Sequence, residues 1–415
     1  MDKEILVYAD LEGVPHLAGR LWARRNSQTA TFQYDAVWLQ HPSRYSLEPA
    51  MGLDPGPFHA PNDLRMFGAI GDSAPDRWGR ALMRRMERRR AELEGASPRT
   101  LHEVDYLLLV DDEARQGALR FAAHEGGPFL REAGGTRIPP LIELPRLLSA
   151  TERVIADDPT DDDLRLLLAP GSSLGGARPK ASVRDRDGHL AIAKFLRRDD
   201  EYNTVAWESV ALALARKAGL SVAAARLETV GHQPVLVLRR FDRDGSHRIP
   251  FLSAMSMLSA RDNQTRSYLE IVDALRQHGA APREDIHALW QRVVFNILIS
   301  NTDDHLRNHG FLYSGPAGWR LSPAYDLNPV PVDVRPRVLS TAVNEDDTTA
   351  SLALAMDVAG YFELTADEAR AIAASTARAV ATWRTEAARH GLARTAIDRM
   401  ASAFEHDDAR LASAY

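Results

Sequence analysis

The chain contains no cysteine, which excludes disulfide bonds, thiolate nucleophiles and cysteine-ligated metals. It also lacks any apolar run near the roughly 20 residues that a membrane-spanning helix needs. No internal repeat or low-complexity tract is present. The opening Met1-Asp2-Lys3-Glu4 has two acids and no apolar stretch, unlike a secretory signal. These absences predict a cytoplasmic protein with no membrane segment.

Lysine is scarce, occurring only at Lys3, Lys180, Lys194 and Lys217; the other members of the 51 basic residues are arginine. In such a chain an internal lysine can mark a place that needs a compact ammonium group. Lys180 and Lys194 fall in the segment to which we assign nucleotide binding below. Lys217, on a predicted helix surface, has no such need.

What is present is an ordinary globular composition. The 415 residues are 45% hydrophobic and 26% charged, with a net charge of −6. This length suits two or three domains, and the charge balance does not demand nucleic-acid binding. An arginine-rich run over 77–90 could contact DNA phosphates. Glutamates interrupt it, however, and a solvated helix face is the simpler interpretation.

Composition shifts divide the chain into three predicted domains. Residues 1–150 form an N-terminal domain, with strands over 4–9 and 29–34 and a helix that starts near 72–75. A Gly/Pro cluster over 126–140 and an acidic stretch over 157–163 mark its end. Residues 151–242 return to strands, with a helix over 205–218. Residues 243–415 are mostly helical, with a buried helix over 286–299 and late helices from Thr365 and about Arg394.

Asp303, Asn308 and Asp326 carry the strongest functional signal. Their D-x-x-x-x-N … D arrangement is typical of kinases, in which one acid receives the proton of the attacking hydroxyl while an amide and a second acid hold Mg²⁺ against ATP phosphates. Strands at 310–313 and 319–321 predict a hairpin that returns Asp326 to this loop. The alternative is that these are ordinary loop and cap residues.

Lys194 lies on an apolar strand, where an ammonium group is costly unless it meets anions such as ATP phosphates. A strand-edge lysine reaching water is the alternative. Glu208, on the next helix, could pair with Lys194 or be an ordinary exposed acid. His305 could be imagined as a metal ligand, but Mg²⁺ prefers oxygen, so a phosphate-facing or supporting role is expected.

Residues 171–180 form a glycine-rich segment ahead of these strands. Paired glycines free backbone N–H groups to approach phosphate, and Arg178 and Lys180 add charge. The spacing matches neither of the common phosphate-binding glycine motifs. A domain linker is therefore the alternative interpretation.

Together these motifs resemble the HipA-like serine/threonine kinases, the toxin components of bacterial type II toxin–antitoxin pairs. The resemblance implies an α+β fold: a protein-kinase-like two-lobe fold with a small β-rich lobe (151–242), a helical C-terminal lobe (243–415) and an additional N-terminal β-containing domain (1–150). The segments that carry it are 67–79, 173–180, Lys194, 239–243, 301–308 and 321–327.

The resemblance also implies ATP and Mg²⁺ as cofactors. Asp303 would be the catalytic base, and Asn308 and Asp326 the Mg²⁺ ligands. Arg239 departs from the family, whose best-known members carry an acid there. The implied ATP-binding residues are Leu174, Gly175, Gly176, Ala177, Arg178, Pro179, Lys180, Lys194, Arg239, Arg240, Phe241, His305, Asn308, Tyr325 and Asp326.

Regulation and partners enter through the resemblance as well. In the family a serine at the position of Ser173 is autophosphorylated, and the added charge ejects the ATP-covering loop; Ser172 is an alternative acceptor. The implied partners are a helix-turn-helix DNA-binding antitoxin, operator DNA through that antitoxin, and a protein substrate. The implied substrate is an aminoacyl-tRNA synthetase, often the glutamyl enzyme, whose phosphorylation inhibits growth. Two other functions stay open: a small-molecule or lipid kinase on the same scaffold, and a catalytically silent co-repressor.

Overall fold

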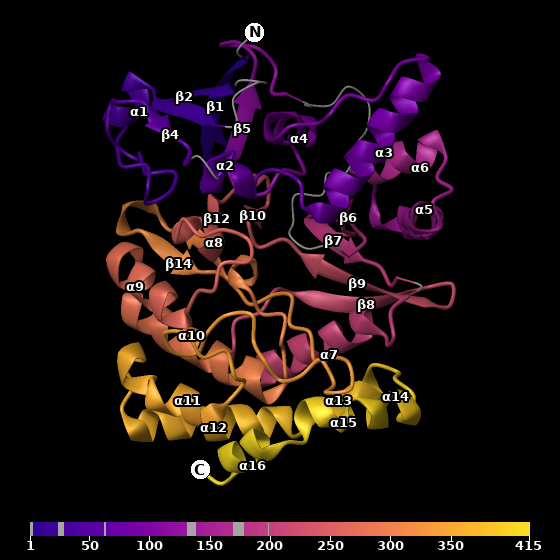
Figure 1. Cartoon of the computed structure of the whole chain (residues 1–415), viewed down its shortest axis with the longest axis vertical. Helices are drawn as coiled ribbons and strands as arrows, with labels where there is room; N and C mark the ends of the chain where they lie inside the picture. The colour runs from indigo at the N-terminus through magenta and orange to yellow at the C-terminus, as the bar shows by residue number, and fades with distance from the viewer. Residues whose placement is uncertain (1–2, 24–28, 62–63, 131–137, 169–177, 198) are drawn as a thin grey trace. The chain divides into compact units, whose positions relative to one another are not determined.

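The computed structural model describes residues 3–23, 29–61, 64–130, 138–168, 178–197 and 199–415 (Figure 1). The chain forms two compact units. The first consists of residues 1–199 and 229–252, and the second of residues 200–228 and 253–415. The division at 1–150, 151–242 and 243–415 stays a prediction, and each unit is described by itself.

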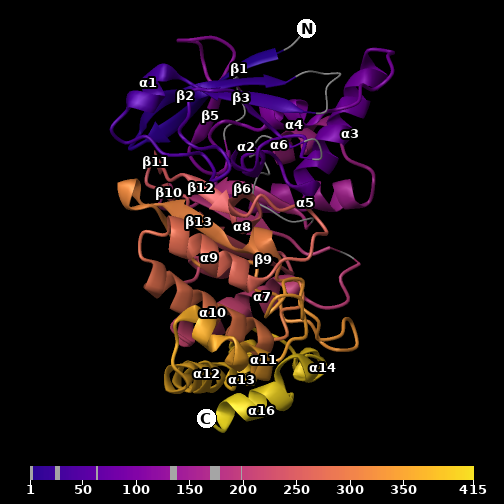
Figure 2. The same cartoon turned by 60° about the vertical axis from the view of Figure 1, so that its left-hand side comes forward.

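The N-terminal part of the first unit contains an antiparallel sheet of order β4-β3-β2-β1-β5, seen in indigo and violet in Figure 2. Gly19 in β2 approaches β3 so closely that a Cβ atom there would lie 2.3 Å from the Gln33 carbonyl oxygen, which explains the glycine. The strands are β1 (Lys3–Leu11), β2 (Val14–Ala23), β3 (Ala30–Tyr34), β4 (Phe58–His59) and β5 (Leu119–Ala122).

The first unit also contains helices and short strands. The helices are α1 (Ala36–Gln40), α2 (Gly68–Asp72), α3 (Arg77–Leu93), α4 (Glu103–Leu109), η1 (Leu141–Glu143), α5 (Leu144–Ile155) and α6 (Asp161–Leu168). The short strands are β10 (Arg243–Asp244) and β11 (His247–Arg248), which pair with each other, and β12 (Phe251–Ser253), whose last residue begins the second unit.

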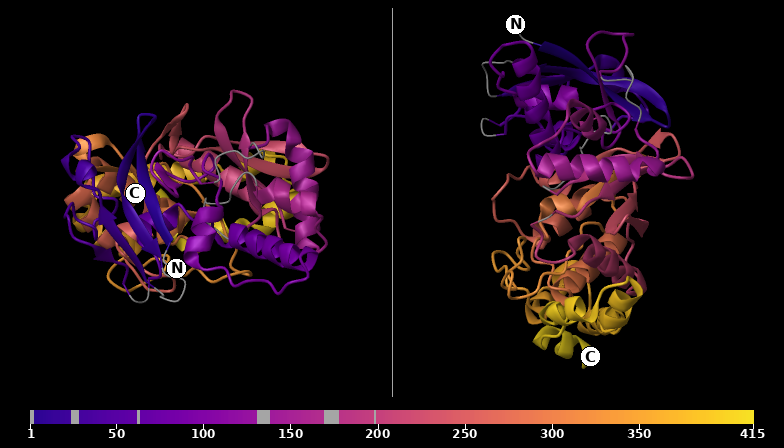
Figure 3. Two further views of the ribbon diagram at one scale, coloured as in Figure 1. Left: turned by 90° about the horizontal axis from the view of Figure 1, so that it is seen from above. Right: turned by 90° about the vertical axis from the view of Figure 1, so that its right-hand side faces the viewer.

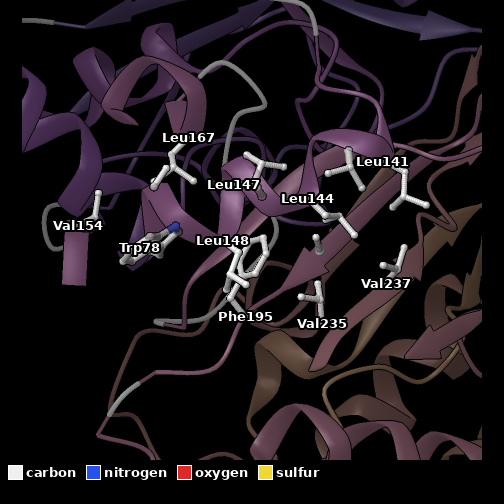
Figure 4. Close-up of a cluster of buried hydrophobic side chains, with 14 of the residues drawn as sticks. Trp78, Leu141, Leu144, Leu147, Leu148, Val154, Leu167, Phe195, Val235 and Val237 are labelled. Atoms are coloured by element: carbon white, nitrogen blue, oxygen red, sulfur yellow. The ribbon is translucent and has the colours of Figure 1, made fainter. Parts of the chain in front are cut away.

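A second sheet has the order β6-β7-β9-β8, and one of its faces packs against helices to form a hydrophobic core. Its strands are β6 (Lys180–Arg184), β7 (Leu190–Lys194), β8 (Ala225–Val230) and β9 (Gln233–Arg239). Helices α3, α5 and α6 supply the facing side chains, including Trp78, Leu147 and Leu167 (Figure 4). Burying each large apolar side chain contributes roughly 1.5–3 kcal/mol. This core joins residues that precede residue 150 with residues that follow it.

The second unit is mostly helical, as Figure 3 shows in orange and yellow. Helix α10 is buried along most of its length and packs against α9, α11 and α12. The helices are α7 (Thr204–Lys217), α8 (Ala254–Met257), α9 (Tyr268–His278), α10 (Pro282–Leu298), η2 (Leu306–Asn308), η3 (Gly315–Ala317), α11 (Leu352–Asp357), η4 (Ala359–Phe362), α12 (Ala366–Val380), α13 (Trp383–Arg389), α14 (Arg394–Arg399), α15 (Ala401–Phe404) and α16 (Asp407–Ser413). Strands β13 (Gly310–Tyr313) and β14 (Trp319–Leu321) form an antiparallel hairpin.

Most predicted elements are confirmed, including that hairpin and the capping box in which Thr365 and Glu368 begin α12. The predicted start of the first long helix near 72–75 is wrong. Helix α3 begins at Arg77, because the Asp76 carboxylate caps it by accepting the Gly79 N–H at 2.8 Å. Residues 68–72 form the separate helix α2. None of the described helices is long and apolar enough to cross a bilayer.

Candidate active site

The predicted catalytic loop leaves α10 at its buried C-terminal end and is fixed at both of its own ends. The Asn301 N–H donates to the Asn296 carbonyl at 2.8 Å, and the Asn301 side-chain amide donates to Asn296 Oδ1 at 3.1 Å. At the far end, the Ala254 N–H donates to the His309 carbonyl at 2.8 Å. Residues 302–308 are therefore a short polar loop held by a rigid helix.

The two adjacent acids of this loop have opposite surroundings. The Asp303 side chain is 60% exposed. Asp304 is buried, and its carboxylate accepts the Tyr268 hydroxyl at 2.5 Å and His309 Nε2 at 2.8 Å. Burial would raise the pKa of Asp304, but the His309 ring and these hydrogen bonds hold that pKa below its usual value. Asp303 is thus the acid that reaches solvent, and Asp304 anchors the loop.

Replacing Tyr268 with phenylalanine should destabilise the protein by about 1.5–3 kcal/mol, the usual value of a hydrogen bond to a charged group. The buried Asp304 carboxylate would lose one of its two described donors. Urea denaturation measures the effect. Tyr361→Phe is the matched control, because Tyr361 donates to Asp273 at 2.6 Å on the exposed surface, and its loss should cost less than about 0.5 kcal/mol. Equal losses in the two variants would contradict the anchoring role.

Asn308 is oriented by the loop itself. Its Nδ2 donates to the backbone carbonyl of Asp303 at 3.2 Å, and its N–H donates to the His305 carbonyl at 2.8 Å. Because the amide nitrogen is used within the loop, Oδ1 is the atom suited to a metal ligand. His305 is half-buried, and its Nδ1 makes no hydrogen bond within the described part of the chain.

Asp326 is brought to the loop by residues on both sides of it. The Tyr325 hydroxyl donates to the Arg307 carbonyl at 2.7 Å, and the Asn328 N–H donates to Asn301 Oδ1 at 3.3 Å. Asp326 itself adopts a left-handed backbone with φ of 58°. Such a conformation costs about 1–3 kcal/mol in a residue other than glycine and clusters at functional sites.

Asn308 and Asp326 would both bind a metal ion through oxygen atoms, which Mg²⁺ prefers as ligands. Within the described ranges, no three His, Asp or Glu side chains converge as a metal site. An Mg²⁺ ion held here would thus draw its remaining ligands from phosphates and water, which is common for this ion. Its assignment to these two residues stays a prediction.

Lys180 and Lys194 lie opposite each other in the register of β6 and β7. Ala181 and Ala193 beside them face the hydrophobic core, so the two lysines belong to the other face of the sheet. Lys180 is buried, and its Nζ lies 2.7 Å from Asp76 Oδ2, the carboxylate that also caps α3. No sequence motif indicates this pairing.

Two of the predicted ATP-binding residues, Arg239 and Arg240, have distinct partners in the first unit. Arg239 is exposed and its Nη2 lies 2.9 Å from a ring nitrogen of His189. Arg240 is buried and makes a two-bond contact with the Asp242 carboxylate, at 2.8 and 2.5 Å. The Arg240 side chain therefore fixes this segment from inside the protein. That Arg240 lies beside a bound nucleotide stays a prediction.

The family described as the HipA-like C-terminal domain matches residues 172–383. This match covers just over half of the chain. The chain belongs to the HipA-like family. The matched range contains Asp303, Asn308 and Asp326, the three residues of the candidate site.

Two curated relatives match parts of this HipA-like chain. "Putative kinase Y4mE" of Sinorhizobium fredii is 29% identical over 181 residues, 37% of this chain and 41% of that protein. "Putative kinase" of Haemophilus influenzae is 28% identical over 117 residues, 26% of this chain and 34% of that protein. The chain thus spans less than half the length of either curated relative.

Among solved structures, HipA of Shewanella oneidensis, determined with HipB and operator DNA, matches with a TM-score of 0.65. The identity is 16%, and the match covers 99% of this chain and 96% of that one. This likeness confirms the predicted fold class, a kinase-like two-lobe fold with an added N-terminal domain.

The predicted ATP-binding residues Leu174, Gly175, Gly176 and Ala177 lie outside the described residues. So do the predicted autophosphorylation site, Ser173, and its alternative, Ser172. Arg178 is exposed and Pro179 is buried. Lys194 belongs to the first unit and Glu208 to the second, and their ion pair stays a prediction.

Sequence reasoning missed several residues around the loop. Tyr268 and His309 hold Asp304, and Asn301 and Asn328 join the two segments of the candidate site. Of these four residues, only Asn301 and His309 could have been singled out from the sequence, because they directly flank the predicted loop.

Proposed function

We propose that this HipA-like chain is an ATP- and Mg²⁺-dependent protein serine/threonine kinase. The observation that carries the proposal is the joining of two segments in the second unit. Asn308 donates to the Asp303 carbonyl, while Tyr325 and Asn328, on either side of Asp326, bond to the same loop. These bonds hold the candidate base, Asp303, and the two candidate metal ligands, Asn308 and Asp326, in one part of the second unit.

In the proposed reaction, Asp303 accepts the proton of a serine or threonine hydroxyl as its oxygen attacks the γ-phosphorus of ATP. The bond from that phosphorus to the β,γ-bridging oxygen breaks, and ADP leaves. Asn308 and Asp326 would hold Mg²⁺, which when bound neutralises charge on the phosphates. Lys194, supported by Glu208, would hold phosphates, together with the glycine-rich loop over 174–180 and residues 239–241. His305 and Tyr325 would lie along the nucleotide.

The proposal includes a toxin role. The substrate would be a host protein, an aminoacyl-tRNA synthetase of the glutamyl type, and a HipB-like helix-turn-helix antitoxin would hold the protein on operator DNA. Phosphorylation of Ser173, or of its neighbour Ser172, would place nearly two negative charges beside the ATP phosphates and switch the kinase off. The similarity to a HipA that was determined with HipB and DNA supports the partner class.

The test is transfer of label from γ-labelled ATP in the presence of Mg²⁺, with a bacterial lysate as the source of acceptors. We expect labelled protein, including this chain itself at Ser172 or Ser173. Substituting each serine separately with alanine identifies the acceptor of the pair. Label found on a metabolite or lipid, with none on protein, would favour the alternative kinase class. Absence of any transfer would contradict kinase activity.

A further inference from the structure

The carboxylate of Asp303 has a cation beside it. Arg335 Nη1 lies 3.1 Å from Asp303 Oδ1, and the two side chains are 50% and 60% exposed. A solvated ion pair of this kind contributes little to stability and breaks readily. A catalytic base must lie within hydrogen-bond reach of the proton it removes. Arg335 therefore contacts one oxygen of the carboxylate that an acceptor hydroxyl has to reach.

The segment around Arg335 exposes apolar side chains. Val332, Val334 and Val338 are 49%, 39% and 47% exposed, and Pro336 is exposed as well. We call these four residues the valine ridge. Each lies one to three residues from Arg335, so their Cα atoms fall within about 11 Å of its Cα atom. Clustered exposed apolar side chains with a polar surround are typical of interaction sites.

The valine ridge is held in place by polar contacts within the second unit. Arg337 Nε donates to Ser300 Oγ at 3.0 Å, and its Nη2 donates to the Ile297 carbonyl at 3.0 Å. The Val332 N–H donates to Ser402 Oγ at 3.1 Å. The end of α10 that leads into the predicted catalytic loop therefore also holds the segment of the valine ridge, and Arg335 in that segment contacts Asp303.

We propose that the valine ridge binds the polypeptide that carries the acceptor hydroxyl, and that this hydroxyl displaces Arg335 from Asp303. The inference rests on the proposed kinase function and specifies its acceptor. That acceptor is a serine or threonine with an apolar side chain one to three residues away in an extended segment. The hydroxyl oxygen bonds to the γ-phosphorus, its proton passes to Asp303, and ADP leaves. The freed Arg335 guanidinium pairs with the transferred phosphoryl group.

A protein acceptor fits this surface better than a polar metabolite does. Burial of the valines is favourable only against apolar groups, and the hydroxyls of a sugar or nucleoside offer few of these. Interfaces that bury an apolar centre with a polar rim are common between proteins. In the proposed interface the valine ridge forms the apolar centre, and Arg335 and Asp303 form part of the polar rim.

The test compares two synthetic peptides with a central serine, one with leucine and one with glutamine two residues after it. For the wild-type protein, kcat/KM should favour the leucine peptide by about tenfold, the worth of one well-placed apolar contact. The double variant V332S/V334S should lose most of this preference. The matched control V14S/V37S, which replaces exposed valines of the first unit, should keep it. Arg335→Gln should lower kcat, because the transferred phosphoryl group loses its partner, and should not raise the peptide KM, because the hydroxyl no longer has to displace a guanidinium. A raised KM with an unchanged kcat would contradict this role of Arg335.

ATP hydrolysis without peptide, measured in parallel, distinguishes a failure of the valine-ridge proposal from a failure of the proposed kinase function. Wild-type protein that hydrolyses ATP but treats the two peptides alike, or a V332S/V334S variant that keeps the preference, would overturn the valine ridge as an acceptor site. Preferential transfer to a lipid or sugar would overturn it too. If wild-type protein neither hydrolyses ATP nor transfers its phosphate, the proposed kinase function fails, and the inference fails with it.

Discussion

Replacing Asp303 with asparagine should lower the rate of phosphoryl transfer by about 10²–10⁴-fold, the usual contribution of a general base. Asparagine keeps the shape of the side chain but cannot take up the hydroxyl proton. Because Asp303 is exposed and its described side-chain contact is with Arg335, the variant should keep the stability of the wild-type protein. Single-turnover transfer from γ-labelled ATP measures the effect, with urea denaturation as the check of folding.

Asp398→Asn is the matched control for this experiment. Asp398 is also an exposed acid of the second unit and pairs with Arg384 at 2.8 Å. Its replacement should leave the transfer rate within about twofold of wild type, because surface changes away from a site have small effects. If the Asp303 variant retained wild-type transfer or wild-type growth inhibition, Asp303 would not be the base.

Replacing Asp242 with asparagine should destabilise the first unit by about 3–5 kcal/mol at neutral pH, as happens when one partner of a buried ion pair is removed. The buried Asp242 carboxylate accepts from Arg240, from Arg243 Nη1 at 2.8 Å and from the Gly117 N–H at 2.8 Å. Its loss would leave two buried guanidinium groups without their shared anion. The midpoint of urea unfolding should fall accordingly.

The buried Asp242 carboxylate should also make the free energy of unfolding depend on pH. Burial alone would raise the pKa of Asp242, but Arg240 and Arg243 outweigh it and hold the pKa far below its usual value. A depressed folded-state pKa adds stability that is fully present above the unfolded value of about 3.9 and is lost as the pH falls below it. The free-energy difference between wild type and Asp242→Asn should therefore narrow from pH 7 to pH 3.

The control for this prediction is Asp367→Asn, which removes an exposed ion pair with Arg370 at 2.6 Å. Its cost should be about 0–1 kcal/mol, as for surface pairs in general. A loss for Asp242→Asn no larger than that of the control would contradict the account of this cluster.

Much of the fold follows from local sequence signals. The Thr365 capping box, the apolar run of α10 and the turn that separates β13 from β14 each act over a few residues and are visible without a structure. The sequence alone places the start of α3 too early. Ser73, Pro75 and Asp76 all suit a helix start, and only the bond between Asp76 and the Gly79 N–H decides among them.

The candidate site was predictable where spacing alone constrains it. Asp303, Asn308 and Asp326 stand at kinase spacing, and the hairpin explains how the third residue returns to the first two. The different roles of Asp303 and Asp304 could not be read from two identical neighbours. Burial by Tyr268, which lies far earlier in the chain, separates them.

Arg335 shows the other limit of the sequence. It lies 32 residues after Asp303, and no motif links the two, yet their side chains are in contact. Lys180 is similar, because its partner Asp76 is 104 residues away. Such long-range pairs depend on how the elements pack, which one sequence does not reveal.

The most direct test of the central claim is the intact mass of the purified protein before and after incubation with ATP. With Mg²⁺ present, the wild-type protein should gain phosphate, and removal of Mg²⁺ by a chelator should prevent the gain. Asp303→Asn should gain none on the same timescale. A wild-type protein that gains no phosphate and transfers none to any acceptor, or an Asp303→Asn variant that matches it, would contradict phosphoryl transfer at this site.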